Sequence, residues 1–209
     1  MRLQKLLKQF YKEVKLAFLE NRLTIYLSLF ILIFSLLSGY LFESYLYSYL
    51  NPAVDNLTRK VETGVVQLTF NDIFLNNISI IFQMFIYGVL LCLSVFLLAY
   101  NGFFIGYYVA IQEDFFRVAI MLIPHGIFEL TSCVLACSSG LVLFNFLFKF
   151  FKSYLIDDLS LTDSFHSNFD KLKQAVLIFF ISVILMMIAG FVEVYLTVPL
   201  AHFILDSFR

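Results

Sequence analysis

The sequence predicts an all-α, polytopic membrane protein with about five transmembrane helices, the third of them broken or re-entrant, and with amphipathic helices on the membrane surface. Hydrophobic residues make up 61% of the 209 residues and charged residues only 14%, with a mean hydropathy of +0.90. A soluble domain is roughly half apolar. Apolar stretches long enough to cross about 30 Å of hydrocarbon also recur along the chain. These observations indicate an integral membrane protein. We expect no nucleic acid partner, because the sequence shows no basic patch typical of nucleic acid binding.

Residues 1–22 form a basic segment that precedes the first apolar stretch. Within 3–18, apolar residues recur at helical spacing, whereas lysines lie mainly on the opposite side: Leu3, Leu6, Leu7, Phe10, Val14 and Phe18 against Lys5, Lys8, Lys12 and Lys15. This pattern is typical of an amphipathic helix on an anionic membrane face. We therefore expect the lipid bilayer as its partner.

The first membrane span is predicted at about 23–42, where about 20 apolar residues follow one another. Residues 43–76 then interrupt the apolar pattern with Pro52, Arg59, Lys60 and Glu62. Apolar residues within this interruption repeat at helical spacing, at Val54, Leu57, Val61, Val65 and Leu68. This periodicity predicts a second surface helix.

The middle of the chain is divided into three further spans. The second is predicted at about 77–100 and the third at about 102–122, with Glu113 and Asp114 near the end of the third. These two acids suggest that the third span is broken or re-entrant, because irregular backbone is tolerated only against protein or water. Pro124 disfavours helix in the residue before it, so the fourth span is expected to run from Pro124 to about Phe148.

The distribution of basic residues predicts the orientation. Six basic residues precede the first span, two lie in the loop 43–76, and four lie in the polar loop 149–173, before a last span at 174–197. The positive-inside rule places the N-terminus and loop 149–173 in the cytoplasm. Loop 43–76 and the tail 201–209 are then external, and 23–200 forms a single transmembrane domain of the cell membrane.

Ionisable side chains interrupt the last two spans. His125 and Glu129 lie four residues apart, so they share one helical face. The predicted topology places Glu193, in the last span, at a similar depth near the outer leaflet, with Asn77 at about the same level. A charge at hydrocarbon depth costs roughly 3 kcal/mol or more, so these groups are expected to be paired or functional.

Three interpretations of this polar cluster remain open. In the first, His125, Glu129 and Glu193 hold the helices together through hydrogen bonds. In the second, the same three side chains bind a divalent metal, since imidazole and carboxylate are suitable ligands for zinc. In the third, they belong to an ion or proton pathway.

Small residues recur at a spacing of four on two predicted helices. One set is Ser132, Ala136 and Gly140, and the other is Gly102 and Gly106. Small faces let membrane helices approach closely, and Gly190 is expected to admit a neighbouring helix in the same way. Packing within one chain is favoured over a homodimer face.

Several motifs together resemble the stage II sporulation protein M family over about residues 20–200. They are Asn76-Asn77, Asn101-Gly102 with Gly106, Pro124-His125-Gly126-Ile127-Phe128-Glu129-Leu130, and Ala189-Gly190 with Glu193 and Thr197. The resemblance implies five spans with the N-terminus inside. It also implies that Asn77, Asn101, His125, Glu129 and Glu193 are motif positions.

The resemblance also implies a function. In spore-forming bacteria the family's namesake anchors an engulfment complex with two peptidoglycan-degrading partners and is not itself a hydrolase, while other members occur in organisms that form no spores. We therefore expect a non-enzymatic membrane scaffold that recruits unidentified membrane or extracytoplasmic proteins, without a cofactor. The partner surfaces would be loop 43–76 and helix 3–18. The alternative is an intramembrane metal-binding enzyme or transporter built on His125, Glu129 and Glu193.

Overall fold

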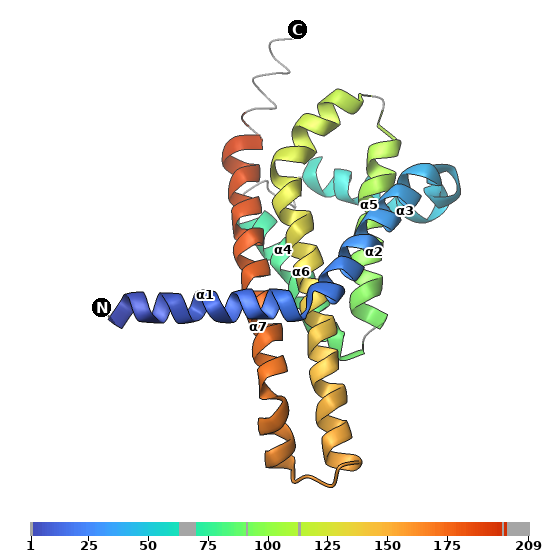
Figure 1. Cartoon of the computed structure of the whole chain (residues 1–209). Helices are drawn as coiled ribbons and strands as arrows, with labels where there is room; N and C mark the ends of the chain where they lie inside the picture. The colour runs from blue at the N-terminus through green and yellow to red at the C-terminus, as the bar shows by residue number, and fades with distance from the viewer. Residues whose placement is uncertain (1, 63–69, 91, 113, 198, 200–209) are drawn as a thin grey trace.

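The computed structural model describes residues 2–62, 70–90, 92–112, 114–197 and 199, and these residues form seven α-helices (Figure 1). They are, in chain order, α1 (Arg2–Glu20), α2 (Arg22–Leu41), α3 (Glu43–Glu62), α4 (Phe70–Ile86), α5 (Cys92–Ala110), α6 (Phe115–Leu155) and α7 (Leu161–Val192). A short 3-10 turn, η1 (Tyr87–Leu90), follows α4, and a π-helical turn, η2 (Glu193–Thr197), follows α7.

Within the described residues, four helical segments are long and apolar enough to cross a membrane: Arg22–Leu41, Cys92–Ala110, Val118–Leu155 and Leu161–Thr197. A shorter apolar helix, Phe74–Leu90, accompanies them. Successive helices α2, α4, α5, α6 and α7 alternate in direction in Figure 1. The all-α membrane fold with about five passes is therefore confirmed.

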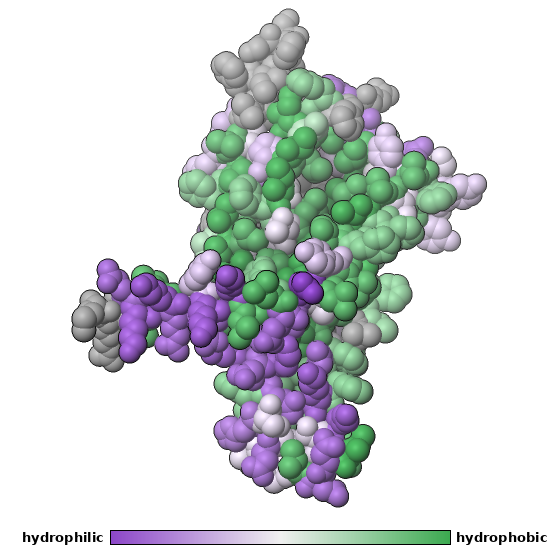
Figure 2. Space-filling model, viewed as in Figure 1, coloured by the Kyte–Doolittle hydropathy of each residue, from purple (hydrophilic) through white to green (hydrophobic). Residues whose placement is uncertain are grey.

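Helix α1 confirms the helix predicted at 3–18, and it lies roughly perpendicular to α6 and α7 (Figure 1). Two ion pairs join it to α7, from Lys173 to Glu13 at 2.8 Å and from Lys171 to Glu20 at 2.9 Å. Figure 2 shows hydrophilic residues along α1 and over the part of the α6–α7 pair below it, and hydrophobic residues above it. Helix α1 thus lies at the boundary between these two surfaces.

The second and third spans differ from the prediction. Residues 77–100 do not form one helix, because the chain turns at η1 and α5 begins at Cys92. Gly88, in η1, contacts the backbone of Gly140 so closely that a Cβ atom there would overlap it. The turn lies within an apolar stretch, so hydropathy gives no sign of it. The segment 102–122 is broken, as predicted, because α5 ends at Ala110 and α6 begins at Phe115. The third helix therefore runs from Cys92 to Ala110 rather than over 102–122.

The predicted break before Pro124 is also absent. Helix α6 runs through Pro124 without interruption and has 41 residues, which makes it about 60 Å long. Membrane helices tolerate proline where neighbouring groups compensate for the lost hydrogen bond. The polar stretch 149–173 is likewise mostly helical, since α6 ends at Leu155 and α7 begins at Leu161. Together these ends form a hairpin that projects past α1 (Figure 1).

Glycines allow α2 and α5 to pack backbone to backbone. A Cβ atom on Gly102 would overlap the Ser35 hydroxyl, and one on Gly106 would overlap the Leu36 carbonyl oxygen. Gly39 of α2 faces the Phe103 backbone in the same manner. Both predicted small residues of α5 therefore pack within the chain, as the intrachain interpretation expects.

The small residues of α6 are buried against several helices. The Ser132 and Ser182 hydroxyls lie 3.0 Å apart, and each donates to the other residue's carbonyl oxygen at 2.8 Å. A Cβ atom on Gly140 would lie 2.7 Å from the Met84 carbonyl oxygen. Ala136 is fully buried, and Gly190 is buried on α7. The predicted Ser132, Ala136 and Gly140 face is thus part of the protein core.

Candidate functional site

A cavity of about 530 Å³ lies between α3, α4, α5 and α6, and we call it the asparagine cavity. Three asparagine side chains and one carboxylate supply most of its polar groups, and the remaining lining is largely apolar and aromatic. The lining residues are Ala53, Asn76, Asn77, Ile80, Leu97, Tyr100, Asn101, Phe104, Ile105, Tyr108, Leu122 and Glu129. Three of the predicted site residues, Asn77, Asn101 and Glu129, therefore share one cavity.

Asn101 joins this cavity because α5 begins earlier than the sequence suggests. The predicted topology places Asn101 near the cytoplasmic face, whereas it lies in the middle of α5. Its Nδ2 donates to the Cys133 Sγ of α6 at 3.4 Å. Cys133 is 1% exposed, so this contact fixes the amide against the interior of the helix bundle.

Asn76 and Asn77 reach the cavity from α4. The Asn76 Nδ2 donates to the Asn77 Oδ1 at 3.3 Å. This contact orients one amide by the other and leaves the Asn76 Oδ1 available as an acceptor. The predicted role of Asn77 as a neighbour of Glu129 is consistent with this arrangement.

Glu129 and His125 lie one turn apart on α6, as predicted. The His125 Nε2 lies 4.0 Å from the Glu129 Oε2, and the two side chains are 12% and 23% exposed. On the other side of the ring, the His125 Nδ1 lies 3.4 Å from the Thr197 Oγ1 of η2. His125 therefore connects the carboxylate that lines the cavity with the end of the last span.

Glu193 lies on the α7 side of Glu129, close enough for the two charges to interact. It is the first residue of η2, the π-helical turn that also carries Thr197. Single π turns within α-helices are rare, and many lie at functional sites. Neither Glu193 nor His125 lines the asparagine cavity. The five predicted residues therefore form two groups: Asn77, Asn101 and Glu129 line the cavity, and His125 and Glu193 lie beside it.

The geometry gives no support to a metal centre on His125, Glu129 and Glu193. Across the described ranges, no three His, Cys, Asp or Glu side chains are grouped closely enough to hold a metal ion. The three predicted ligands are described, so the negative finding applies to them. Cys133 and Cys137 are buried on α6, where Cys133 accepts from the Asn101 amide.

The aromatic wall of the cavity was not predicted from the sequence. Tyr100, Phe104 and Tyr108 recur every fourth residue on α5, and the rings of Tyr100 and Phe104 stack with centroids 6.5 Å apart. The signal is this spacing together with Asn101 on the same helix. It is weak in a chain with 27 phenylalanines and 12 tyrosines, since aromatic residues occur on every helix.

Comparison with known proteins gives two matches. The family described as stage II sporulation protein M matches residues 27–198 of this chain. An uncharacterised protein of Methanocaldococcus jannaschii is 32% identical over 147 residues, which cover 67% of this chain and 77% of that protein. No solved structure matches.

Proposed function

This chain belongs to the stage II sporulation protein M family, and from that premise we propose that it is a non-enzymatic membrane scaffold that recruits partner proteins. The observation that carries this proposal is a helix that packs on the bundle and displays exposed aromatic side chains. That helix is α3, which corresponds to the partner surface expected within 43–76. The part of that surface at 63–69 lies outside the described residues.

Helix α3 is attached to α5 by a small core of its own. Leu50, Val54 and Tyr107 are buried together, and the Tyr107 hydroxyl donates to the Asn51 Oδ1 at 3.2 Å. The hydrogen bond and the buried apolar contacts together attach this part of α3 to the bundle. A surface that is ordered before binding loses less conformational entropy when a partner docks.

The opposite side of α3 presents tyrosines. Tyr45 and Tyr49 lie one turn apart, on the side away from Leu50 and Val54, and are both 80% exposed. Tyrosine is enriched in protein interfaces because it combines a large apolar area with a hydroxyl group. We assign these tyrosines to the partner surface, on the external side that the positive-inside rule gives to α3.

The proposal is tested with the double variant Tyr45→Ala/Tyr49→Ala. A photo-crosslinking amino acid at the exposed position 48, beside Tyr45 and Tyr49, captures proteins that contact this side of α3 in native membranes, and mass spectrometry identifies them. We expect one partner protein to dominate, and its yield to fall at least about fivefold in the double variant, because truncating two interface aromatics typically costs several-fold or more in affinity.

The matched control is Phe30→Ala/Phe34→Ala, which removes two exposed, stacked rings one turn apart on α2. This variant should retain the captured partner, because α2 is a membrane span. An equal loss in both variants, or an unchanged yield in the α3 variant, would refute recruitment by α3. Size-exclusion chromatography in detergent verifies that both variants fold.

A further inference from the structure

We propose that the asparagine cavity binds an amphiphile whose head group is a protonated amine and whose apolar body lies against the aromatic wall of α5. This proposal is independent of partner recruitment by α3. It rests on the size of the cavity, on the hydrogen-bonding groups left open inside it, and on the carboxylate of Glu129 in its described lining.

The cavity has the dimensions of a binding site for a small amphiphile. Its volume of about 530 Å³ lies within the range of roughly 300–1,000 Å³ that is usual for ligand pockets. Such pockets combine a largely apolar lining with a few convergent polar groups. Asn76, Asn77, Asn101 and Glu129 are such groups here, and they come from three helices.

The cavity keeps open acceptors beside the donors of its amide and phenol groups. Asn101 uses its Nδ2 on Cys133, and Asn76 uses its Nδ2 on Asn77, so each keeps a carbonyl oxygen available. Glu129 contributes a carboxylate, which is an acceptor when ionised. An ammonium group has three donors and no acceptor, so it complements this set of oxygens.

Among the lining residues that the structure describes, Glu129 is the one Asp, Glu, Lys, Arg or His side chain. In the part of the chain that the structure describes, its single ion-pair partner is His125, at the long distance of 4.0 Å. A partly buried carboxylate without a close counter-charge has a desolvation cost, and a bound cation would offset that cost. A phosphate or carboxylate head group would instead face a like charge.

The aromatic wall supports the same ligand class. Tyr100, Phe104 and Tyr108 present three rings along α5 beside Asn101. Aromatic faces attract ammonium groups, and they also pack against apolar chains. The wall can therefore contact both the head group and the first carbons of its chain.

The test uses a dodecylamine that carries a photoreactive diazirine near its amino end. The purified chain is reconstituted in phosphatidylcholine nanodiscs, irradiated with the probe, and digested for mass spectrometry. We expect labelled peptides from α5 and α6, and protection by unlabelled dodecylamine but not by equal concentrations of dodecanol or dodecanoate. Equal protection by dodecanol would overturn recognition of the ammonium group.

Three variants assign the binding to this cavity. Glu129→Gln should reduce labelling about tenfold, whereas Asp157→Asn, which changes an exposed acid outside the cavity between α6 and α7, should alter it less than twofold. Ile105→Trp fills the space without altering a charge and should reduce labelling at least fivefold. Full labelling of either Glu129→Gln or Ile105→Trp would overturn the proposal. Size-exclusion profiles identify any variant that misfolds. If Glu129→Gln or Ile105→Trp misfolds, the labelling of the other variant tests the proposal.

Discussion

Close backbone contact at a few glycines determines how the helices of this protein pack. On α5, both Gly102 and Gly106 face α2, and the space for a side chain is occupied by Ser35 or by the Leu36 carbonyl oxygen. Membrane helices gain much of their association energy from such packing, because lipid removes the hydrophobic driving force between helices. Each of these glycines is therefore expected to be intolerant of any side chain.

The variant Gly106→Ala tests this packing at a single residue. Its methyl group would overlap backbone atoms that cannot rotate away, so we expect a loss of about 2 kcal/mol or more and a fall in Tm of roughly 4–8 °C. Thermal unfolding in detergent measures the effect. Gly126→Ala is the control, because a Cβ there would contact only the Leu122 Cγ at 3.9 Å. Similar melting temperatures for the two variants would contradict the role of Gly106.

The candidate site shows what local sequence reasoning can predict. The four-residue spacing of His125 and Glu129 correctly places the two side chains together, and the alternating spans correctly place Glu193 near Glu129. Asn101 was misplaced, because its position depends on where α5 begins rather than on its neighbours in the sequence. The metal hypothesis found no support, because spacing along one helix does not determine how far a second helix lies from it.

Individual helices were predicted well where polar residues mark their ends. Helix α2 was expected at 23–42 and is found at Arg22–Leu41, between polar segments. The turn at η1 was missed because it depends on Gly88 packing against Gly140, a contact between residues far apart in the sequence. Helix α6 passes through Pro124, which shows that proline alone did not end a helix supported on several sides.

Helix α1 is positioned by polar contacts that respond to pH. The Glu20 carboxylate accepts from the Gln174 Nε2 at 2.8 Å and from the Lys171 Nζ at 2.9 Å. These hydrogen bonds, with that from Gln174 the largest cause, lower the pKa of Glu20 from its ordinary value of 4.5. A carboxyl with a lowered pKa stabilises the docked helix fully above its ordinary pKa and ceases to do so as the pH falls through the lowered value.

We therefore expect α1 to detach more readily below pH 4.5. The contribution is at most about 1 kcal/mol, because Glu20 is well exposed and salt screens the pair. Spin labels at Tyr11→Cys and Phe169→Cys, in a Cys92→Ser background, report the distance between α1 and α7. Glu20→Gln should remove part of the pH dependence, and an unchanged profile in this variant would contradict the assignment.

The whole molecule combines a membrane bundle with a polar hairpin and a perpendicular helix. Hydropathy was sufficient to predict the all-α fold and about five passes, because apolar length is a property of each segment alone. The asparagine cavity could not be predicted in this way, since it requires α3, α4, α5 and α6 to be placed together. Its existence depends on α4 and α5 being separate passes, which is the central claim of this account.

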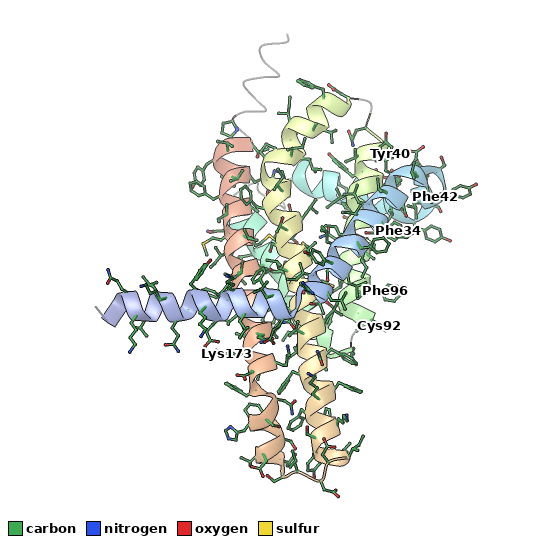
Figure 3. The ribbon with its side chains drawn as sticks, in the orientation of Figure 1. Phe34, Tyr40, Phe42, Cys92, Phe96 and Lys173 are labelled. Atoms are coloured by element: carbon green, nitrogen blue, oxygen red, sulfur yellow. The ribbon has the colours of Figure 1, made fainter. Side chains whose placement is uncertain are left out.

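Native Cys92 tests that claim directly. It is exposed at the start of α5 and lies at a height similar to that of Lys173 in Figure 3, whereas Cys133 and Cys137 are buried. A membrane-impermeant maleimide should label Cys92 in inverted vesicles and not in right-side-out vesicles, with Cys92→Ser as the control. If Cys92 is labelled from neither side, it lies within a single span at 77–100, and the account is contradicted. If it is labelled in right-side-out vesicles, the proposed orientation is contradicted.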